Sequence, residues 1–246
     1  MALWLIGAFL ATALLYASVG YGGGSTYSAL LALSGYDYRL LPILSLSCNV
    51  VVVTGSLIRF ARAGVVPWRG GLVLSLVAAP LAFLGGLTPI TERSFLVLLG
   101  ISLIAAAVLL LLPTTAQDRP GGGRAARLMP FAAAPLGYLA GVVGIGGGIF
   151  LAPLLHLSRW DNARRIAATA SLFILINSVS GLVGQLTKAG VGRFSEAIGD
   201  GLPLLLAVVI GGQIGSLLAL RLLPECVIRW LTAALTLYAG SRLLLG

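Results

Sequence analysis

The sequence predicts an all-α integral membrane protein made of two inverted-topology repeats, each a glycine-broken helical hairpin followed by three transmembrane helices. Three observations support this fold class. Hydrophobic residues make up 59% of the 246 residues and charged residues only 9%, whereas a soluble domain carries about 25% charged residues. Apolar runs of roughly 17–25 residues recur, as a hydrocarbon core about 30 Å thick requires of each spanning helix. The third observation is an internal repeat centred on two glycine-rich segments.

The first half of the chain begins with a broken apolar segment. The run Leu3–Val19 is followed by Gly22–Gly24 and then only by a short apolar run to Leu33. Because the N-terminus has no positively charged region and no obvious cleavage site, we expect residues 3–19 to be retained rather than removed as a signal peptide. Three unbroken runs come next, which we predict to be transmembrane helices: Leu41–Leu57, Gly70–Leu87 and Phe95–Leu112.

The second half follows the same order. Pro130–Val143 is followed by Gly146–Gly148 and a short run to Leu157. The next three apolar runs are Ala167–Leu186, Leu202–Leu220 and Val227–Leu245. Between the halves lies the only hydrophilic linker of any length, at residues 114–129, which holds Asp118, Arg119, Pro120 and three glycines. The sequence therefore predicts a first membrane repeat at residues 1–113 and a second at 130–246.

Residue identities support the repeat. The second half matches the first at a shift of 124 residues, so that Val19–Gly24 corresponds to Val143–Gly148. At the same shift, Asp37 matches Asp161, Ser45 matches Thr169 and Ser47 matches Ser171. The second half is then two residues longer, and Gly55 matches Gly181. Such internal symmetry is typical of many secondary transporters. A duplicated membrane domain without a transport role is the alternative.

The distribution of positive charge favours hairpins. If each broken segment crosses the membrane once, the 16 Lys and Arg residues divide almost evenly between the two sides. If each enters and returns on one side, eleven of the 16 lie in the cytoplasm and five outside, namely Arg39, Arg93, Lys188, Arg193 and Arg242. The hairpin arrangement therefore fits the positive-inside rule better. It places both termini on the non-cytoplasmic side, and it lets the two glycine turns meet near the midplane from opposite faces.

The glycine turns are the strongest candidate for a binding site. Each break exposes the first N–H groups of the following helix, and these donors, together with the positive end of the helix dipole, favour an anion. Ser25 and Thr26 add hydroxyl donors beside the first turn. A dinucleotide-binding interpretation fails, because no soluble βαβ unit surrounds either turn. Asn49 and Asn177 interrupt apolar runs in the two halves, so we expect their side chains to face the bundle interior.

Acidic residues argue against a cation carrier. All seven Asp and Glu residues lie in or beside loops, away from the middle of any span, where cation pathways and proton relays place carboxylates. His156, the only histidine, is interpreted as an interfacial or hydrogen-bonding residue, with a proton shuttle as the alternative. We expect no cofactor, no metal and no nucleic-acid partner, since the basic residues lie between apolar runs and form no stripe. The expected partners are a small anionic substrate and the lipid bilayer, and a homodimer remains open.

The two glycine turns also carry a resemblance to a known family. The turn at Gly20–Gly24, its copy at Gly144–Gly148, and the run from Ala168 to Asn177 resemble the sulfite exporter TauE/SafE family. The resemblance implies an inner-membrane permease that exports small sulfur-containing or organic anions, such as sulfite or sulfoacetate, and it implies no enzymatic activity. The site positions that it implies are Gly22, Gly23, Gly24, Asn49, Gly146, Gly147, Gly148, Thr169, Ser171 and Asn177.

Three other functions remain open at this point. A selective anion channel would use the same pocket without alternating access to it. A non-transporting assembly subunit would need no substrate site. An intramembrane enzyme would need a metal cluster, a carboxylate pair within a span or a nucleophile beside a histidine, and the sequence offers none of these patterns.

The hairpin arrangement predicts the side of the membrane on which the C-terminus lies. An alkaline phosphatase fused to the C-terminus should be active, and a green fluorescent protein fused there should be dark, because both termini are expected outside the cytoplasm. Fusions made after Arg62, in the first predicted cytoplasmic loop, should give the opposite result and serve as the control. A fluorescent C-terminal fusion would contradict the hairpin arrangement.

Overall fold

Almost all of the described chain is helical. The computed structural model describes residues 3–112, 124–218 and 225–245, and it contains no strand within them. The predicted all-α class is therefore confirmed for these residues. The helices of the first half are α1 Leu3–Val19, α2 Gly24–Leu33, α3 Leu41–Arg62, α4 Trp68–Leu87 and α5 Glu92–Leu111. Those of the second half are α6 Arg124–Val143, α7 Gly148–Leu157, α8 Ala163–Leu218 and α9 Glu225–Leu245.

Two boundaries differ most from those predicted. Helix α8 joins the run Ala167–Leu186 to the described part of the run predicted at Leu202–Leu220, because the residues between them are helical except Gly190, whose φ of 81° and ψ of 163° bend α8 into two arms. Helix α6 begins at Arg124, inside the segment predicted as a linker, while residues 114–123 lie outside the described part of the chain. The bend needs a glycine, since other residues rarely adopt this φ.

Length and composition make several helices suitable for a bilayer. Within the described residues, four helices are long and apolar enough to cross a membrane, namely α3, α4, α5 and the long α8. Helices α1, α6 and α7 contain shorter apolar stretches. Large apolar side chains point outward, for example Leu76 on α4 (62% exposed) and Ile101 on α5 (53% exposed). Outward apolar faces on single helices suit contact with lipid rather than with water.

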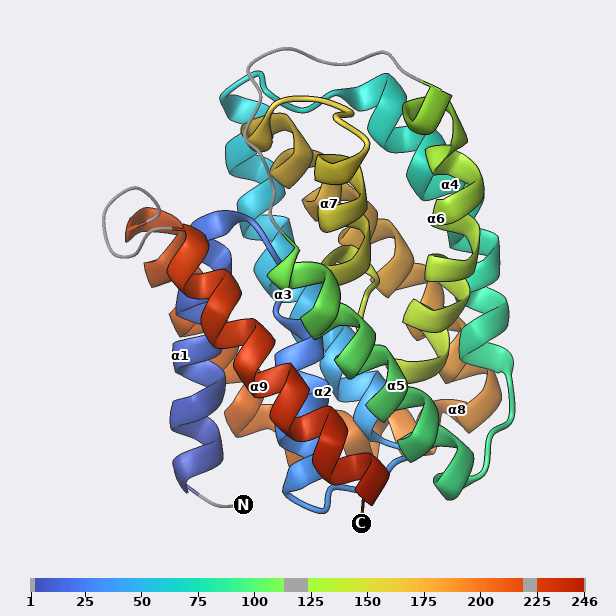
Figure 1. The fold of residues 1–246 in the computed structure, drawn as a ribbon. Coiled ribbons are helices and arrows are strands. Elements are labelled where there is room, and N and C mark those ends of the chain that lie inside the picture. The colour runs from blue at the N-terminus through green and yellow to red at the C-terminus, as the bar shows by residue number, and fades with distance from the viewer. Residues whose placement is uncertain (1–2, 113–123, 219–224, 246) are drawn as a thin grey trace.

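The helices alternate in direction along the bundle. In Figure 1, α1 begins at the lower end and α2 returns to it, whereas α6 begins at the upper end and α7 returns there. Helix α9 ends at the lower end, where α1 begins. Throughout, the lower end is the one where α1 begins and α9 ends, and the upper end is the one where α3 ends and α6 begins.

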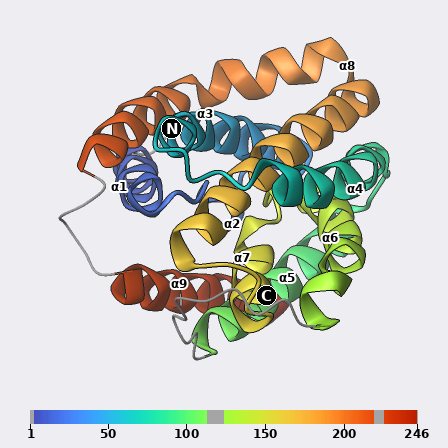
Figure 2. The ribbon, with the colours of Figure 1, turned by 90° about the horizontal axis from the view of Figure 1, so that it is seen from above.

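The two short helices lie at the centre of the bundle. Figure 2 shows α2 and α7 in the middle, with α5 and α9 side by side on one flank and the second arm of α8 on the opposite flank. Nearly all residues of α2, from Gly24 to Leu31, are buried. Helix α8 packs most extensively on α1, α3 and α4, while α4 also packs on α6 and α5 on α9. The bundle thus surrounds both helices that follow the glycine turns.

Glycines bring α4 into backbone contact with its neighbours. A Cβ atom on Gly141 of α6 would overlap the carbonyl oxygen of Ala82, and one on Gly137 would overlap that of Ala78. On the other side of α4, a Cβ on Gly184 of α8 would overlap the carbonyl oxygen of Phe83. Small residues allow this close approach in lipid, where dispersion forces and not the hydrophobic effect hold helices together. Helix α4 thereby links α6 to α8.

We expect Gly141→Ala to destabilise the bundle by about 1–3 kcal/mol, because the added methyl group forces α6 away from α4. Thermal unfolding of the detergent-purified variant measures this effect. Gly7→Ala on α1 is the matched control, since no atom lies within 4 Å of the position that its Cβ would take. Its unfolding temperature should be unchanged or slightly higher. Equal unfolding temperatures for the two variants would contradict the packing argument.

Candidate functional site

Both glycine turns depend on left-handed backbone conformations. Gly23 and Gly147, which immediately precede α2 and α7, have φ values of 81° and 77°. Gly20 and Gly144, three residues earlier in each turn, have φ values of 87° and 76°. Residues with a Cβ atom adopt this region only at a cost, so glycine is required at these positions. The repeated glycine signature therefore encodes two matching breaks in the helices.

Helix α3 of the first half holds the turn of the second half. The hydroxyl of Ser45 donates to two carbonyl oxygens, that of Gly144 at 2.8 Å and that of Gly24 at 3.1 Å. The same hydroxyl accepts a hydrogen bond from Ser28 at 3.0 Å. One turn further along α3, the Nδ2 of Asn49 donates to the carbonyl oxygen of Ile145 at 3.1 Å. Two consecutive carbonyls of the second turn are thus satisfied by α3.

Helix α8 of the second half holds the turn of the first half in return. The hydroxyl of Ser171 donates to the carbonyl oxygen of Gly20, and it also lies 3.0 Å from the carbonyl oxygen of Ala167 on its own helix. Ser171 is fully buried. Each glycine turn is therefore bound by a side chain from the other half of the chain.

The turns open onto a cavity. It has a volume of about 50 Å³, which is room for on the order of four water molecules and hence for a small oxyanion. Its lining includes the starts of α2 and α7, at Gly24 and Gly148, and the inward face of Asn49. No side-chain hydrogen bond caps either helix start, so the N–H groups of the first two residues of each helix have no side-chain cap at this cavity.

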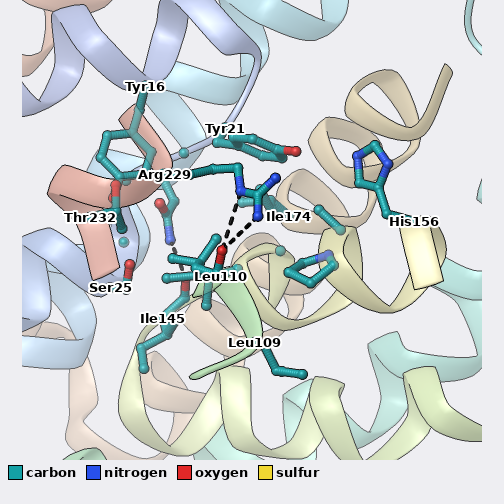
Figure 3. A pocket seen from close by; sticks show the side chains of 18 residues that line it. Tyr16, Tyr21, Ser25, Leu109, Leu110, Ile145, His156, Ile174, Arg229 and Thr232 are labelled. Carbon is teal, nitrogen blue, oxygen red and sulfur yellow. Dashed lines mark hydrogen bonds between the residues drawn. The ribbon is translucent and has the colours of Figure 1, made fainter. Parts of the chain in front are cut away.

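Arg229 brings a positive charge to this cavity. Figure 3 shows its guanidinium among the lining side chains, between Tyr21 and Leu110. Its Nη2 donates to the carbonyl oxygens of Leu110 and Leu112 at 2.8 Å each. Arg229 therefore satisfies the C-terminal end of α5 as well as lining the cavity, and it couples α9 to α5 at this point.

A chain of hydroxyl groups borders the cavity on the side of α1. The hydroxyl of Tyr16 donates to Thr232 Oγ1 at 2.6 Å and shares a hydrogen bond with Thr26 Oγ1 at 2.9 Å. All three side chains are buried. Tyr16, Thr232 and Ser25 line the cavity itself. These bonds join α1, α2 and α9 around the start of α2.

Asn49 lies where the two turns meet. Its side chain is fully buried, and its Oδ1 has no hydrogen-bond partner among the described residues. A Cβ atom on Gly22 would come within 2.5 Å of this oxygen, and one on Gly146 would come within 2.6 Å of Nδ2. A buried amide oxygen without a donor is costly. The amide therefore points to a donor, supplied by water or by a ligand, in the cavity that Asn49 lines.

The structure brings half of the predicted site residues to this cavity. They are Gly22, Gly23, Gly24, Ser25, Asn49 and Gly148. Thr26 shares a hydrogen bond with Tyr16, which lines the cavity. Ser171 binds the first turn from α8, and Gly146 belongs to the second turn, but neither lines the cavity. Thr169 and Asn177 donate to carbonyl oxygens of their own helix, at Arg165 and Phe173. Gly147 shapes the backbone, and its Cβ position lies 2.9 Å from the ring of Phe173.

Several lining residues with polar side chains were not predicted as site residues, namely Tyr16, Tyr21, His156, Arg229 and Thr232. Of these, His156 was interpreted as an interfacial or hydrogen-bonding residue, and Arg229 is one of the eleven basic residues that the hairpin arrangement assigns to the cytoplasm. The available signal for Arg229 was its position inside the apolar run Val227–Leu245, since a charge within a span marks a functional position. His156 lies in the last turn of α7, and its position at the cavity follows only from the three-dimensional arrangement.

Comparison with known proteins places the chain among membrane transporters. The family described as Sulfite exporter TauE/SafE matches residues 4–243. A protein of Sinorhizobium fredii, named Probable membrane transporter protein y4hK, is 31% identical over 247 residues, covering 96% of each chain. Probable membrane transporter protein MJ0441 of Methanocaldococcus jannaschii is 26% identical over 180 residues, covering 68% of this chain and 66% of the relative. No solved structure matches the chain.

The bridging role of Ser45 can be tested against its neighbour Ser47, whose hydroxyl donates only to Ile43 on its own helix at 2.8 Å. We expect Ser45→Ala to lower the free energy of unfolding by about 1–3 kcal/mol, because it leaves the buried carbonyl of Gly144 without its donor. Ser47→Ala should change it by less than about 0.5 kcal/mol. Chemical or thermal unfolding in detergent measures both. Equal stability of the two variants would show that the bridge contributes nothing.

Proposed function

The chain belongs to the sulfite exporter TauE/SafE family and is a multi-pass membrane transporter, and on this premise we propose that it exports a small anion. The proposed substrate is a sulfur oxyanion or an organosulfonate of the sulfite or sulfoacetate type. The observation that carries the proposal is the convergence of two uncapped helix starts, those of α2 and α7, on one cavity beside Arg229.

Electrostatics favour an anion in this cavity. Each helix start carries a partial charge of about +0.5, and the guanidinium of Arg229 adds a full positive charge. Among the described residues that line the cavity there is no Asp or Glu. The surroundings are buried and largely apolar, so that each of these charges acts over a longer range than it would in water. A monovalent or divalent anion would therefore neutralise an otherwise positive site.

The size and polarity of the cavity support the proposed substrate class. A volume of about 50 Å³ suits a small oxyanion more closely than a large organic acid. Backbone N–H groups and the hydroxyl of Ser25 are donors of the kind that oxyanions bind. The printed name of the family refers to sulfite, whereas the names of the two relatives specify no substrate.

For the membrane arrangement we propose two inverted repeats, residues 1–113 and 130–246, in a bacterial-type inner membrane with both termini on the non-cytoplasmic side. The opposite entry of the α1–α2 and α6–α7 hairpins supports this arrangement (Figure 1). The positive-inside rule then assigns the upper end to the cytoplasm, since Arg59 and Arg62 lie in the last turn of α3. The cavity reaches the C-terminal ends of α5 and α7, which point toward the same end.

Export in this direction needs no coupled ion. An anion that leaves a cell with a negative interior gains about 2.3 kcal/mol per charge per 100 mV. The site would load from the cytoplasmic side through the cavity and then open toward the other face. The protein's own residues bind and orient the anion, and the proposal includes no chemical step and hence no enzymatic activity.

Ligand binding to the purified protein tests this proposal. We expect sulfite or a small sulfonate to raise the unfolding temperature of the wild type, since saturating ligand at one hundred times its dissociation constant contributes about 2.7 kcal/mol. Arg229→Gln should weaken binding by about tenfold, because it removes a charged donor from the cavity. Arg242→Gln, which changes a cation in the last turn of α9, is the control and should bind like the wild type.

The other outcomes separate the alternatives. If no sulfur anion or carboxylate shifts the unfolding temperature, the proposed substrate class is wrong. If Arg229→Gln binds as tightly as the wild type, the anion binds elsewhere. In proteoliposomes, saturable flux with counterflow indicates a carrier, and conductance far above carrier turnover indicates a channel.

A further inference from the structure

A second cavity lies on the opposite side of the glycine turns. Its volume is about 200 Å³, and it lies toward the lower end of the bundle, where α2 leads into α3 and α4 into α5 (Figure 1). The α2–α3 connection contributes Arg39, and the two sides of the bend in α8 contribute Lys188 and Arg193. We call these three residues the basic triad.

The positive-inside rule gives no reason for this cluster. In the proposed topology only five of the 16 Lys and Arg residues lie outside the cytoplasm. Three of those five form the basic triad and line one cavity. They come from two segments about 150 residues apart in the chain, so their proximity arises from folding and not from sequence. Cations gathered in this way on the side where they are scarce point to a ligand.

The described carboxylates near this end form no ion pair with the triad, although Asp37 and Glu92 act electrostatically on Arg39. Within the described residues, no Asp or Glu lines the cavity and no triad residue forms an ion pair. Glu196 and Asp200 lie near Tyr36, where they act together with burial, the larger cause, to raise the pKa of that hydroxyl to about 12. Asp37 accepts a hydrogen bond from the backbone N–H of Arg39 at 2.9 Å rather than from its guanidinium.

Two of the three triad side chains are positioned by contacts that use only part of their donors. The Nζ of Lys188 donates to the carbonyl oxygen of Thr88 at 3.2 Å, which uses one of its three N–H groups. The Nε of Arg39 donates to the hydroxyl of Tyr38 at 3.1 Å, and its guanidinium lies 5.4 Å from the centre of that ring. These contacts orient the two cations and leave their remaining N–H groups for an acceptor.

The two cavities lie along the same stretch of α3. Pro42 and Val142 line the second cavity, and a Cβ atom on Gly144 would come within 2.6 Å of the Cα of Pro42. Ser45, on the next turn of α3, binds the carbonyl oxygen of Gly144. Asn49, which lines the first cavity, lies seven residues beyond Pro42, or about 10 Å along the helix.

We propose that the basic triad forms a second oxyanion site, the vestibule into which the transported anion is released. This inference rests on the proposed function for the direction of transport, but the site itself is defined by its own residues. Its ligand is a small oxyanion such as sulfite or sulfate. Exposed cations bind such anions weakly and in a salt-dependent manner, which suits a site of release more than one of capture. The phosphate of an anionic lipid offers the same chemistry.

Equilibrium dialysis with radiolabelled sulfite and sulfate tests the second site. The protein is held in nanodiscs of phosphatidylcholine, and the variant combines Arg39→Gln, Lys188→Gln and Arg193→Gln. We expect the wild type to bind two anions per chain with different affinities, and the triple variant to lose the weaker site by a factor of about ten or more. The control combines Arg93→Gln and Arg242→Gln, two outside cations that do not line the cavity.

The outcomes separate this inference from the proposed function. Arg229→Gln should weaken only the tighter site. If this variant binds at the tighter site as well as the wild type does, the result counts against the proposed function and does not bear on the triad. Unchanged binding of two anions by the triple variant, or equal loss in the control, overturns the vestibule. Arg193→Gln alone should weaken the triad site in part. If only the triple variant loses this site, misfolding of the triple variant explains the loss. Loss of the weaker site on adding phosphatidylglycerol to the nanodiscs would assign the triad to lipid and overturn the vestibule.

Discussion

The structure depends on the pairing of backbone groups at two broken helices. In an apolar interior an unpaired carbonyl or N–H costs several kcal/mol, so irregular backbone persists there only where other groups satisfy it. Ser45 and Asn49 on α3 satisfy the second turn, and Ser171 on α8 satisfies the first. Because each half of the chain supplies the partners for the turn of the other, neither half is complete alone. The central position of α2 and α7 follows from this exchange.

The sequence predicted the features that depend on local constraints. Apolar runs of sufficient length marked α3, α4 and α5, because hydrocarbon thickness sets a minimum length. The glycine signatures marked both turns, because only glycine adopts the left-handed conformations at Gly23 and Gly147 without strain. Asn49 was identifiable as a polar residue within a span. Such a residue is costly in hydrocarbon and therefore indicates a functional position.

The contacts between the two halves of the chain could not be predicted from the sequence. Ser45 and Ser171 hold the turns, but the repeat aligns Ser45 with Thr169 and Ser47 with Ser171, so the working hydroxyls are offset by two residues. Thr169 and Ser47 instead bind their own helices. Arg229 donates a hydrogen bond to the carbonyl oxygen of Leu110 at the end of α5, which is far away in the chain. These contacts depend on how the two halves of the chain pack together, and no sequence pattern within one half predicts them.

Because of this offset, the two turns are bound by different side chains on different helices. Both carbonyls of the second turn, at Gly144 and Ile145, are bound to α3, and the same helix carries Pro42 at one cavity and Asn49 at the other. Under the proposed function, a path between the cavities would separate the second turn from α3 and break the bonds of Ser45 and Asn49, including the bond of Ser45 to Gly24. The bond of Ser171 to Gly20 would still attach the first turn to α8. Where water or the anion replaces the lost partners, two hydrogen bonds of this kind have a net strength of about 1–3 kcal/mol together, which is small enough for a bound anion and the membrane potential to shift the balance.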